Sequence, residues 1–301
     1  MQLFFNILTR AAELGLIAIG LTMVYDLLRF ASFAHTEFAM VGAYLAYFFK
    51  VGLGMNFVVS AFLAVVCTGL LGVVMDRAIF RWLRGRQAAT LMVASIGLAI
   101  VLRSAVTAIW GGNAKDLGFG VQESLIILGA RITPTRIWVV LTALVAMTLF
   151  HLFLHFTPMG KAIRATSDNK NLAEASGINS DRIVMYMWFI ACAFAGIGGI
   201  LLGIETQLQP TMGQAIMLSI FAVAILGGIG NVYGAMVGAL LFAAAENIGL
   251  ALNFGSLLRT IGHIQIGDLQ IPVEYKPAIA FLTLILVLLF RPRGVLGRKE
   301  G

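Results

Sequence analysis

Charged residues are scarce in this chain, since Asp, Glu, Lys and Arg make up 12% of its 301 residues while hydrophobic residues make up 60%. An average soluble domain carries about 25% charged residues. The mean hydropathy is correspondingly high, at +0.94. This composition excludes an ordinary soluble domain and indicates an all-α, polytopic membrane protein.

Cysteine is also scarce. Cys67 and Cys192 both lie inside apolar runs, so no disulfide framework holds an outer domain together. We expect both to be packed or lipid-facing thiols. The first apolar run follows a single early positive charge, Arg10, and matches a full membrane span. We therefore expect an N-terminus that is not cleaved.

Catalytic and cofactor motifs are missing as well. The glycine-rich run at 226–234, LGGIGNVYG, lacks the Lys-Ser/Thr ending of a phosphate-binding loop. His151 and His155 stand one helical turn apart, but no third ligand completes a metal site. No nucleophile is accompanied by a base. We predict that the protein is not an enzyme and has no catalytic residue, cofactor or metal site of its own.

The apolar residues form windows of about 20 residues, the length that spans a bilayer. We predict helices near 11–29, 34–50, 56–76, 90–110, 137–156, 183–203, 214–230, 232–252 and 277–290. The two outer loops, 111–136 and 253–276, are too short and apolar to be separate domains. The prediction is one transmembrane domain over residues 1–301, a helix bundle with about eight to nine spans.

The basic residues occupy short loops between these windows, and their distribution tests which loops lie on which side of the membrane. With the N-terminus outside, thirteen lie on the inner side, namely Arg29, Arg77, Arg81, Arg84, Arg86, Lys161, Arg164, Lys170, Arg182, Arg291, Arg293, Arg298 and Lys299. Seven lie on the outer side, namely Arg10, Lys50, Lys115, Arg131, Arg136, Arg259 and Lys276. Cytoplasmic loops are rich in Lys and Arg, so the polar stretch 157–182 and the C-terminus are predicted to be cytoplasmic. Topology and lipid head groups explain the basic excess better than nucleic acid does.

This polar stretch reads TPMGKAIRATSDNKNLAEASGINSDR and carries a helix signal. Asp168 or Asn171 can act as N-cap, and Glu174 has capping-box spacing from Asn171. Gly177 marks a C-terminal stop, and Ser180 can cap the helix that follows. We predict a structured loop that meets a partner.

Several ionisable residues lie within or beside the apolar windows. A charge there is energetically unfavourable unless it is paired or in contact with water. His35 and Glu37 open the second window near Asp26 and Arg29. Two interpretations stay open for them, a salt-bridge cluster at the ends of two helices and a role in a transport path or gate. We expect the remaining three to pair with one another, namely Arg103, Glu205 and Glu246.

Glycine marks two further features. Gly228, Gly230 and Asn231 predict a tight turn or broken helix between two windows, and broken backbone at membrane depth lines a cavity or pathway. We therefore treat these three as candidate pathway or gate residues. Rows of small residues let helices approach closely, and they are Ala195, Gly199 and Gly203, then Gly230, Gly234 and Gly238.

The chain holds neither a nucleotide motif nor a relay of paired intramembrane carboxylates, so it cannot drive uphill transport alone. The energy therefore has to come from a partner. A short cytoplasmic helix between windows 137–156 and 183–203 is placed to act as a lever, because movement of an attached partner would tilt both windows.

Four separated segments carry a family resemblance. They are LIAIGLTMVY at 16–25 with FAH at 33–35, Glu37 and GAY at 42–44; Arg164, Ala165, Ala173, Gly177, Ile178, Asn179, Asp181 and Arg182; LGGIG at 226–230 with GAM at 234–236; and Pro292, Gly294, Leu296 and Gly297. In this order they resemble the H-type permease subunit of the branched-chain amino acid ABC importer family, over nearly the whole chain.

The resemblance implies import of branched-chain or other small amino acids by alternating access across a bacterial cytoplasmic (inner) membrane. It also implies a heterodimer with a second permease subunit, two cytoplasmic ATPase subunits that use ATP and Mg²⁺, and a periplasmic or surface-tethered substrate-binding protein. The segment 165–178 would then dock into an ATPase groove. The coupling-loop residues assigned on this basis are Gly160, Arg164, Ala165, Ala173, Glu174, Gly177, Ile178, Asp181 and Arg182.

The chain departs from the family pattern at Asp26, Ser32 and Thr36, where Gly, Asn and Gly are usual, and at 174–176, where the family is more apolar. The departures at Asp26, Ser32 and Thr36 leave the substrate open between amino acids and urea or short amides, and those at 174–176 are expected to match a particular ATPase partner. Two rivals from other classes are an ion-coupled secondary carrier, with His35 and Glu37 as its ion site, and a membrane-embedded enzyme or scaffold.

Overall fold

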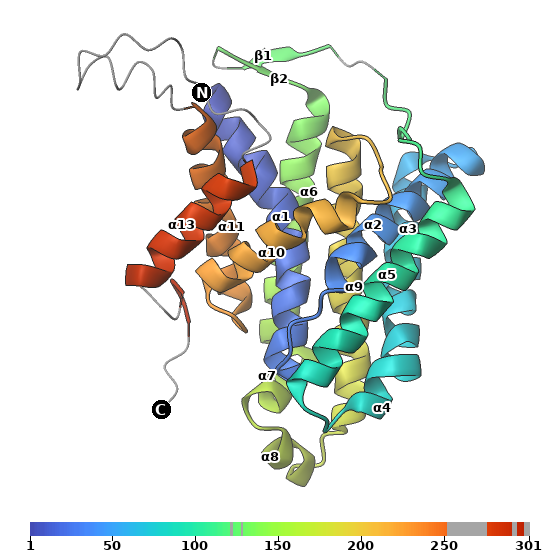
Figure 1. Ribbon diagram of the computed structural model, residues 1–301, viewed down its shortest axis with the longest axis vertical. Helices are drawn as coiled ribbons and strands as arrows, with labels where there is room; N and C mark the ends of the chain where they lie inside the picture. The colour runs from blue at the N-terminus through green and yellow to red at the C-terminus, as the bar shows by residue number, and fades with distance from the viewer. Residues whose placement is uncertain (121–122, 128, 252–275, 291–293, 298–301) are drawn as a thin grey trace.

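The protein is a bundle of helices (Figure 1), and the computed structural model describes residues 1–120, 123–127, 129–251, 276–290 and 294–297. Its helices are α1 (Gln2–Leu28), α2 (His35–Tyr47), α3 (Phe57–Met75), α4 (Arg81–Leu83), α5 (Ala88–Trp110), α6 (Pro134–Phe156), α7 (Pro158–Asp168), α8 (Lys170–Ala175), α9 (Ser180–Glu205), α10 (Met212–Gly227), α11 (Val232–Ala251) and α13 (Lys276–Phe290). Two π-helical segments, Phe48–Gly52 and Asp76–Phe80, continue α2 and α3.

Each of the nine predicted windows contains a helix, so the predicted helical membrane fold is confirmed. Among the described residues, six stretches are long and apolar enough to span a membrane, namely Gln2–Leu28, Phe57–Leu83, Ala88–Trp110, Pro134–Phe156, Ser180–Glu205 and Val232–Gly249. α10, with 16 residues, is shorter. Cys67 and Cys192 are free thiols inside the bundle, as expected, with Cys192 fully buried.

The two ends of the bundle differ. At one end, here called the hairpin end, lie the N-terminus and an antiparallel hairpin of β1 (Leu125–Ile127) and β2 (Ala130–Ile132). At the opposite end, here called the α8 end, lie α4, α7 and α8 (Figure 1). The predicted inner loops 77–86 and 157–182 share the α8 end, and 111–136 lies at the hairpin end, in agreement with the predicted threading. The predictions for Arg259, Arg291, Pro292, Arg293, Arg298 and Lys299 lie outside the described residues.

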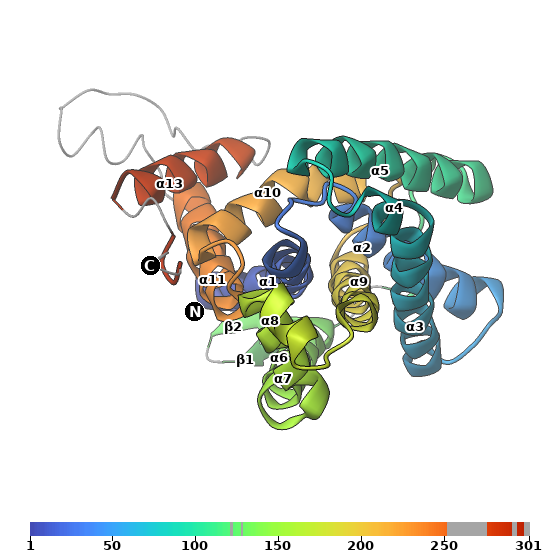
Figure 2. The ribbon, with the colours of Figure 1, turned by 90° about the horizontal axis from the view of Figure 1, so that it is seen from below.

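Two helices form the centre of the bundle. In the apolar windows of α1 and α9, 83% and 78% of residues are buried, against 22–28% in α3, α5 and α6. α9 packs against α1, α2 and α3 (Figure 2). The outer helices therefore carry the surface that meets lipid or other subunits.

Small residues allow the closest of these contacts, as the sequence predicted. A Cβ atom on Gly199 of α9 would overlap the backbone of Ala39 on α2, and a Cβ atom on Gly42 would lie 2.5 Å from the Cα of Gly196. The second row acts in the same way, because Gly234 of α11 lies against the backbone of Gly227. These glycines bring helix backbones together without an intervening side chain.

Two helices begin inside the bundle rather than at its surface. His35, the first residue of α2, places Nε2 3.2 Å from the carbonyl O of Ile17, near the middle of α1. α10 begins beside it, because a Cβ atom on Gly213 would lie 2.8 Å from the carbonyl O of Thr36. From there α10 runs toward the α8 end, where Gly230 lies beside Asp26. The sequence did not predict these starts at half depth.

Candidate functional site

The polar stretch 157–182 forms two short helices joined to α6 by a sharp corner. Thr157 ends α6 with an extended backbone, which the following Pro158 favours. Its hydroxyl donates to the carbonyl of Phe153 at 2.7 Å and accepts the N–H of Gly160 at 3.0 Å. A side chain on Gly160 would overlap the backbone of Leu154. Gly160 therefore permits the corner, and α7 folds back against the end of α6.

α7 is amphipathic and packs against α6, α9 and α1. Ile163 and Ser167 are buried on its inner face, Ala165 is half-buried, and Arg164 is exposed. The guanidinium of Arg29, at the end of α1, donates to the carbonyl O of Ser167 at 3.3 Å. α7 is therefore attached to three transmembrane helices at once.

α8 has a cap at each end. Asn169 is its N-cap, because the Asn169 side chain accepts the N–H of Leu172 at 3.0 Å. The predicted caps Asp168 and Asn171 are therefore wrong. The extended backbone of an N-cap occurs at Asn169, and its amide oxygen reaches the N–H three residues ahead.

The C-terminal stop at Gly177 is confirmed. Gly177 has φ +84° and donates its N–H to the carbonyl of Glu174 at 3.0 Å, while Ile178 donates to the carbonyl of Ala173, also at 3.0 Å. This pair of bonds is the Schellman arrangement, which favours glycine because its left-handed position strains other residues. Ala173 is buried beneath the turn and Ile178 is half-buried.

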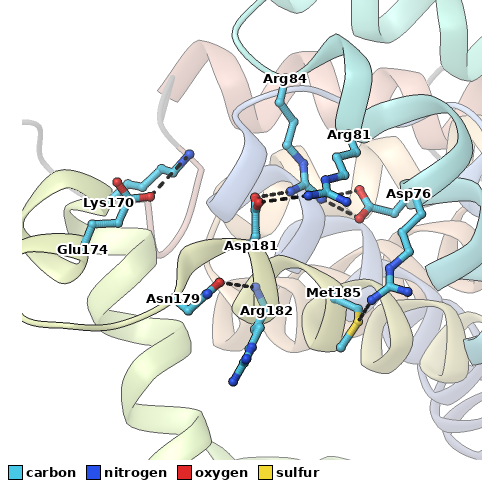
Figure 3. A network of polar contacts seen from close by, with 10 residues as sticks. Asp76, Arg81, Arg84, Lys170, Glu174, Asn179, Asp181, Arg182 and Met185 are labelled. Atoms are coloured by element: carbon cyan, nitrogen blue, oxygen red, sulfur yellow. Dashed lines mark hydrogen bonds and ion pairs between the residues drawn. The ribbon is translucent and has the colours of Figure 1, made fainter.

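α9 begins in a network of charges shown in Figure 3. Asn179 caps this helix by accepting the N–H of Arg182 at 3.0 Å, so the predicted cap at Ser180 is wrong by one residue. Arg84 joins two carboxylates, with Nη1 2.8 Å from Asp181 Oδ1 and Nη2 2.7 Å from Asp76 Oδ1. Asp76 is buried, so this bridge connects the end of α3 to the start of α9.

The tip of α8 is exposed and mixed in character. Leu172 is 65% exposed, which is unusual for an aliphatic side chain outside the apolar spans. Lys170 and Glu174 flank it in sequence, but they pair with each other at 3.8 Å on the opposite face of the helix. An exposed aliphatic side chain of this kind is a typical anchor of a protein contact. α8 can therefore seat in a groove of a partner.

The predicted turn at Gly228, Gly230 and Asn231 is confirmed, with φ +104° and +81° at the two glycines. The Asn231 side chain accepts the N–H groups of Tyr233 and Gly234 and caps α11. Its amide also donates to the carbonyl of Leu296 at 2.8 Å. The tail segment 294–297 therefore lies on this turn, and a pathway role for the three residues stays a prediction.

The pairing predicted for the ionisable residues is wrong. Arg103 donates to Glu37 Oε1 at 2.5 Å, so Glu37 is not in a cluster with Arg29. The other carboxylates pair across the hairpin end, Glu205 with Arg136 at 3.1 Å and Glu246 with Arg10 at 3.4 Å. These partners are 66 to 236 residues apart in the chain. Sequence proximity carries no information about such pairs.

The residues that the sequence analysis overlooked are Asp76 and Arg84. A signal was present, because Asp76 is the one acidic residue of the apolar window 56–76, and an ionisable residue in a span indicates a partner or a function. Arg84 was used only in the charge count. The structure brings both to the start of α9, beside the predicted coupling residue Asp181.

A bundle of long apolar helices with a short, capped helix projecting from one end defines the class, a polytopic helical membrane protein. The family model described as the permease component of the branched-chain amino acid transport system matches residues 3–288. The chain belongs to this family and is a permease subunit of an ABC importer.

Curated relatives cover the whole chain. The high-affinity branched-chain amino acid transport system permease protein LivH of Salmonella typhimurium is 30% identical over 100% of this chain and 96% of its own length. The corresponding protein BraD of Pseudomonas aeruginosa is 32% identical with the same coverage. The fold resembles PsaBC of Streptococcus pneumoniae, solved in complex with Fab, with a TM-score of 0.51 and 13% identity over 97% of this chain and 93% of that chain.

Proposed function

We propose that this subunit passes branched-chain or similar aliphatic amino acids through a bacterial cytoplasmic membrane. Its partners are a second permease subunit, two ATPase subunits that use ATP and Mg²⁺, and a substrate-binding protein outside the membrane. The names of the curated relatives support the substrate class. The projecting α8, with its exposed Leu172, is the observation that carries the role of the ATPase.

The proposed orientation places the α8 end in the cytoplasm and the N-terminus outside. The inner loops 77–86 and 157–182 contribute eight basic residues, which are Arg77, Arg81, Arg84, Arg86, Lys161, Arg164, Lys170 and Arg182. Such a bias favours the cytoplasmic side. In this orientation, α8 is on the side where ATP is available.

Force enters, on this account, through α8. A displacement of α8 reaches α9 through the short turn 176–179 and reaches α6 through α7. α9 is central and packs on α1, α2 and α3, so its tilt moves the middle of the bundle. Helices that meet at glycine have few interlocking side chains and can slide past one another. ATP binding and hydrolysis in the partner would thereby alternate access to the pathway.

The test compares two exposed aliphatic residues at opposite ends of the bundle. Leu172→Asp places a charge on the tip of α8, and Ile126→Asp, at a residue 74% exposed on β1, is the matched control. The complete importer is purified through the permease and reconstituted in vesicles with leucine-loaded binding protein. We expect Leu172→Asp to lose the ATPase on purification and to lose ATP-driven leucine uptake, while Ile126→Asp keeps both. Full retention of ATPase and uptake by Leu172→Asp would refute α8 as the docking element.

A further inference from the structure

Unpaired polar atoms gather where α2 begins. Among the described residues, the buried side-chain atoms without a hydrogen-bond partner include Ser32 Oγ, His35 Nδ1, Thr36 Oγ1, Glu37 Oε2 and Arg103 Nε. A buried polar atom that stays unpaired destabilises the folded protein. This group contains both hydrogen-bond donors and acceptors, and both a carboxylate and a guanidinium. It indicates a place where water or a polar ligand supplies the missing hydrogen bonds.

The cluster lies at half depth, where two helices begin together. The first turns of α2 and α10 meet there, because a Cβ atom on Gly213 would lie 2.6 Å from Glu37 Oε2. The N-terminus of a helix carries a partial positive charge. Helices that begin at the membrane midplane direct this charge toward anionic groups of transported substrates.

The ion pair of Glu37 and Arg103 belongs to this group of polar atoms, and its Arg103 side is partly exposed at the surface of the bundle. Arg103 of α5 donates to Glu37 Oε1 and to Gln214 Oε1 of α10, each at 2.5 Å. Glu37 is 1% exposed, whereas the side chain of Arg103 is 26% exposed and Gln214 is exposed. A charged group is costly against lipid. The face between α5 and α10 therefore borders water or protein at this depth.

An apolar chamber lies along the same helices. It has a volume of about 200 Å³ and is lined by Phe33, Met92 and Phe221, among others. Phe221 is two turns of α10 beyond Gln214, about 10 Å toward the α8 end. A cavity of about 150 Å³ is large enough to hold benzene, so the chamber has room for an aliphatic side chain. A leucine side chain does not reach it from a head group at the ion pair, so the chamber is separate from the site proposed below.

We propose that the Glu37–Arg103 pair and the first turns of α2 and α10 form a mid-membrane site for the zwitterionic head group of the transported amino acid. The carboxylate binds the Arg103 guanidinium and the start of α10, and the ammonium group binds Glu37 and the hydroxyl of Thr36. A neutral amide such as urea offers no charge to either member of the pair. This inference rests on the proposed function and adds the residues that bind the head group of the substrate within the membrane.

The experiment uses the complete importer in vesicles, with leucine uptake, ATP hydrolysis and thermal unfolding measured on each variant. Glu37→Gln and Arg103→Gln each remove one charge. Gln214→Leu changes an exposed residue and leaves the ion pair in place, so it tests the site without disturbing the core. Arg136→Gln is the matched control, because it breaks another interhelical pair, with Glu205 at 3.1 Å, outside the proposed site.

We expect Glu37→Gln and Arg103→Gln to lower leucine uptake about tenfold or more, and Gln214→Leu to lower it about threefold or more. Hydrolysis stimulated by the loaded binding protein should stay near that of the Arg136→Gln control. The unfolding temperature of Gln214→Leu, which leaves the buried pair intact, should stay near that of the unaltered importer. A parallel fall of uptake, hydrolysis and unfolding temperature, or normal uptake by all three variants, would show a purely structural pair and overturn the inference. If the unaltered importer shows no ATP-driven leucine uptake, the proposed function fails and this inference fails with it.

Discussion

At the scale of single residues, Gly177 decides the shape of the turn that follows α8. Its φ of +84° turns the chain sharply at the end of α8, and no atom lies within 4 Å of where its Cβ would be. The constraint is therefore conformational rather than steric. A residue that cannot adopt positive φ changes the direction in which α8 is held relative to α9.

Gly177→Pro should uncouple the two activities of the importer. Proline fixes φ near −65° and removes the N–H that donates to Glu174, so the α8 end reorganises at a cost of more than about 1 kcal/mol. The measurement is leucine taken up per ATP hydrolysed in vesicles, and we expect it to fall. Gly54→Pro, at another exposed glycine with positive φ, +67°, but far from α8, should leave the ratio unchanged. Equal ratios in both variants would count against the lever.

The Asp76–Arg84 contact is expected to matter more for stability than the Asp181–Arg84 contact. Asp76 is 2% exposed in its side chain, whereas Asp181 is 58% exposed. Asp76→Asn should lower the free energy of unfolding by about 1–3 kcal/mol, and Asp181→Asn by less than about 1 kcal/mol. Denaturation of the purified permease in detergent measures both. A larger effect from Asp181→Asn would contradict this assignment of burial.

Single residues also show where local patterns fail. The sequence predicted that caps begin α8 and α9 but chose Asp168, Asn171 and Ser180, each within two residues of the true caps Asn169 and Asn179. Asn, Asp and Ser have similar capping preferences. Tertiary packing of α7 and α9 decides which of several neighbouring candidates takes the extended backbone.

At the scale of elements, the contact of α2 with α9 organises the bundle. Gly42, Gly196 and Gly199 bring the two backbones together, and the same pairing holds the start of α2 at half depth. Hydropathy windows predicted both helices, because a span is a property of local composition. They did not predict that α2 and α10 begin inside the bundle, since depth is set by partners distant in sequence.

Gly199→Leu should prevent correct assembly of the bundle. Even a Cβ atom there would overlap the Ala39 backbone, so α2 and α9 would have to separate. Gly97→Leu on α5 is the matched control, because nothing lies within 4 Å of the Cβ position. Size-exclusion profiles of fluorescently tagged permease report the outcome. We expect aggregation or loss of the monodisperse peak only for Gly199→Leu, and identical profiles would contradict the close packing.

At the scale of the whole molecule, the protein has a central pair of helices, α1 and α9, and the short helices α7 and α8 lie at one end of the bundle. α8 is joined to α9 directly and to α6 and α1 through α7, while Arg84 ties the start of α9 to α3. In the proposed mechanism, a displacement of α8 is transmitted through α9 to α2 and α5, which carry Glu37 and Arg103. The polarity and capping residues of 157–182 predicted a short helix there. The structure shows which transmembrane helices this segment contacts.

The most direct test of this account is a photo-crosslink from the tip of α8. A photoreactive phenylalanine analogue replaces Leu172 in the complete importer, and the same analogue at Ile126 is the control from the hairpin end. Mass spectrometry identifies the crosslinked subunit after illumination in native membranes. We expect an ATPase adduct from position 172 and none from position 126. An adduct of position 172 with the substrate-binding protein, or no ATPase adduct from it, would contradict the claim that force enters through α8.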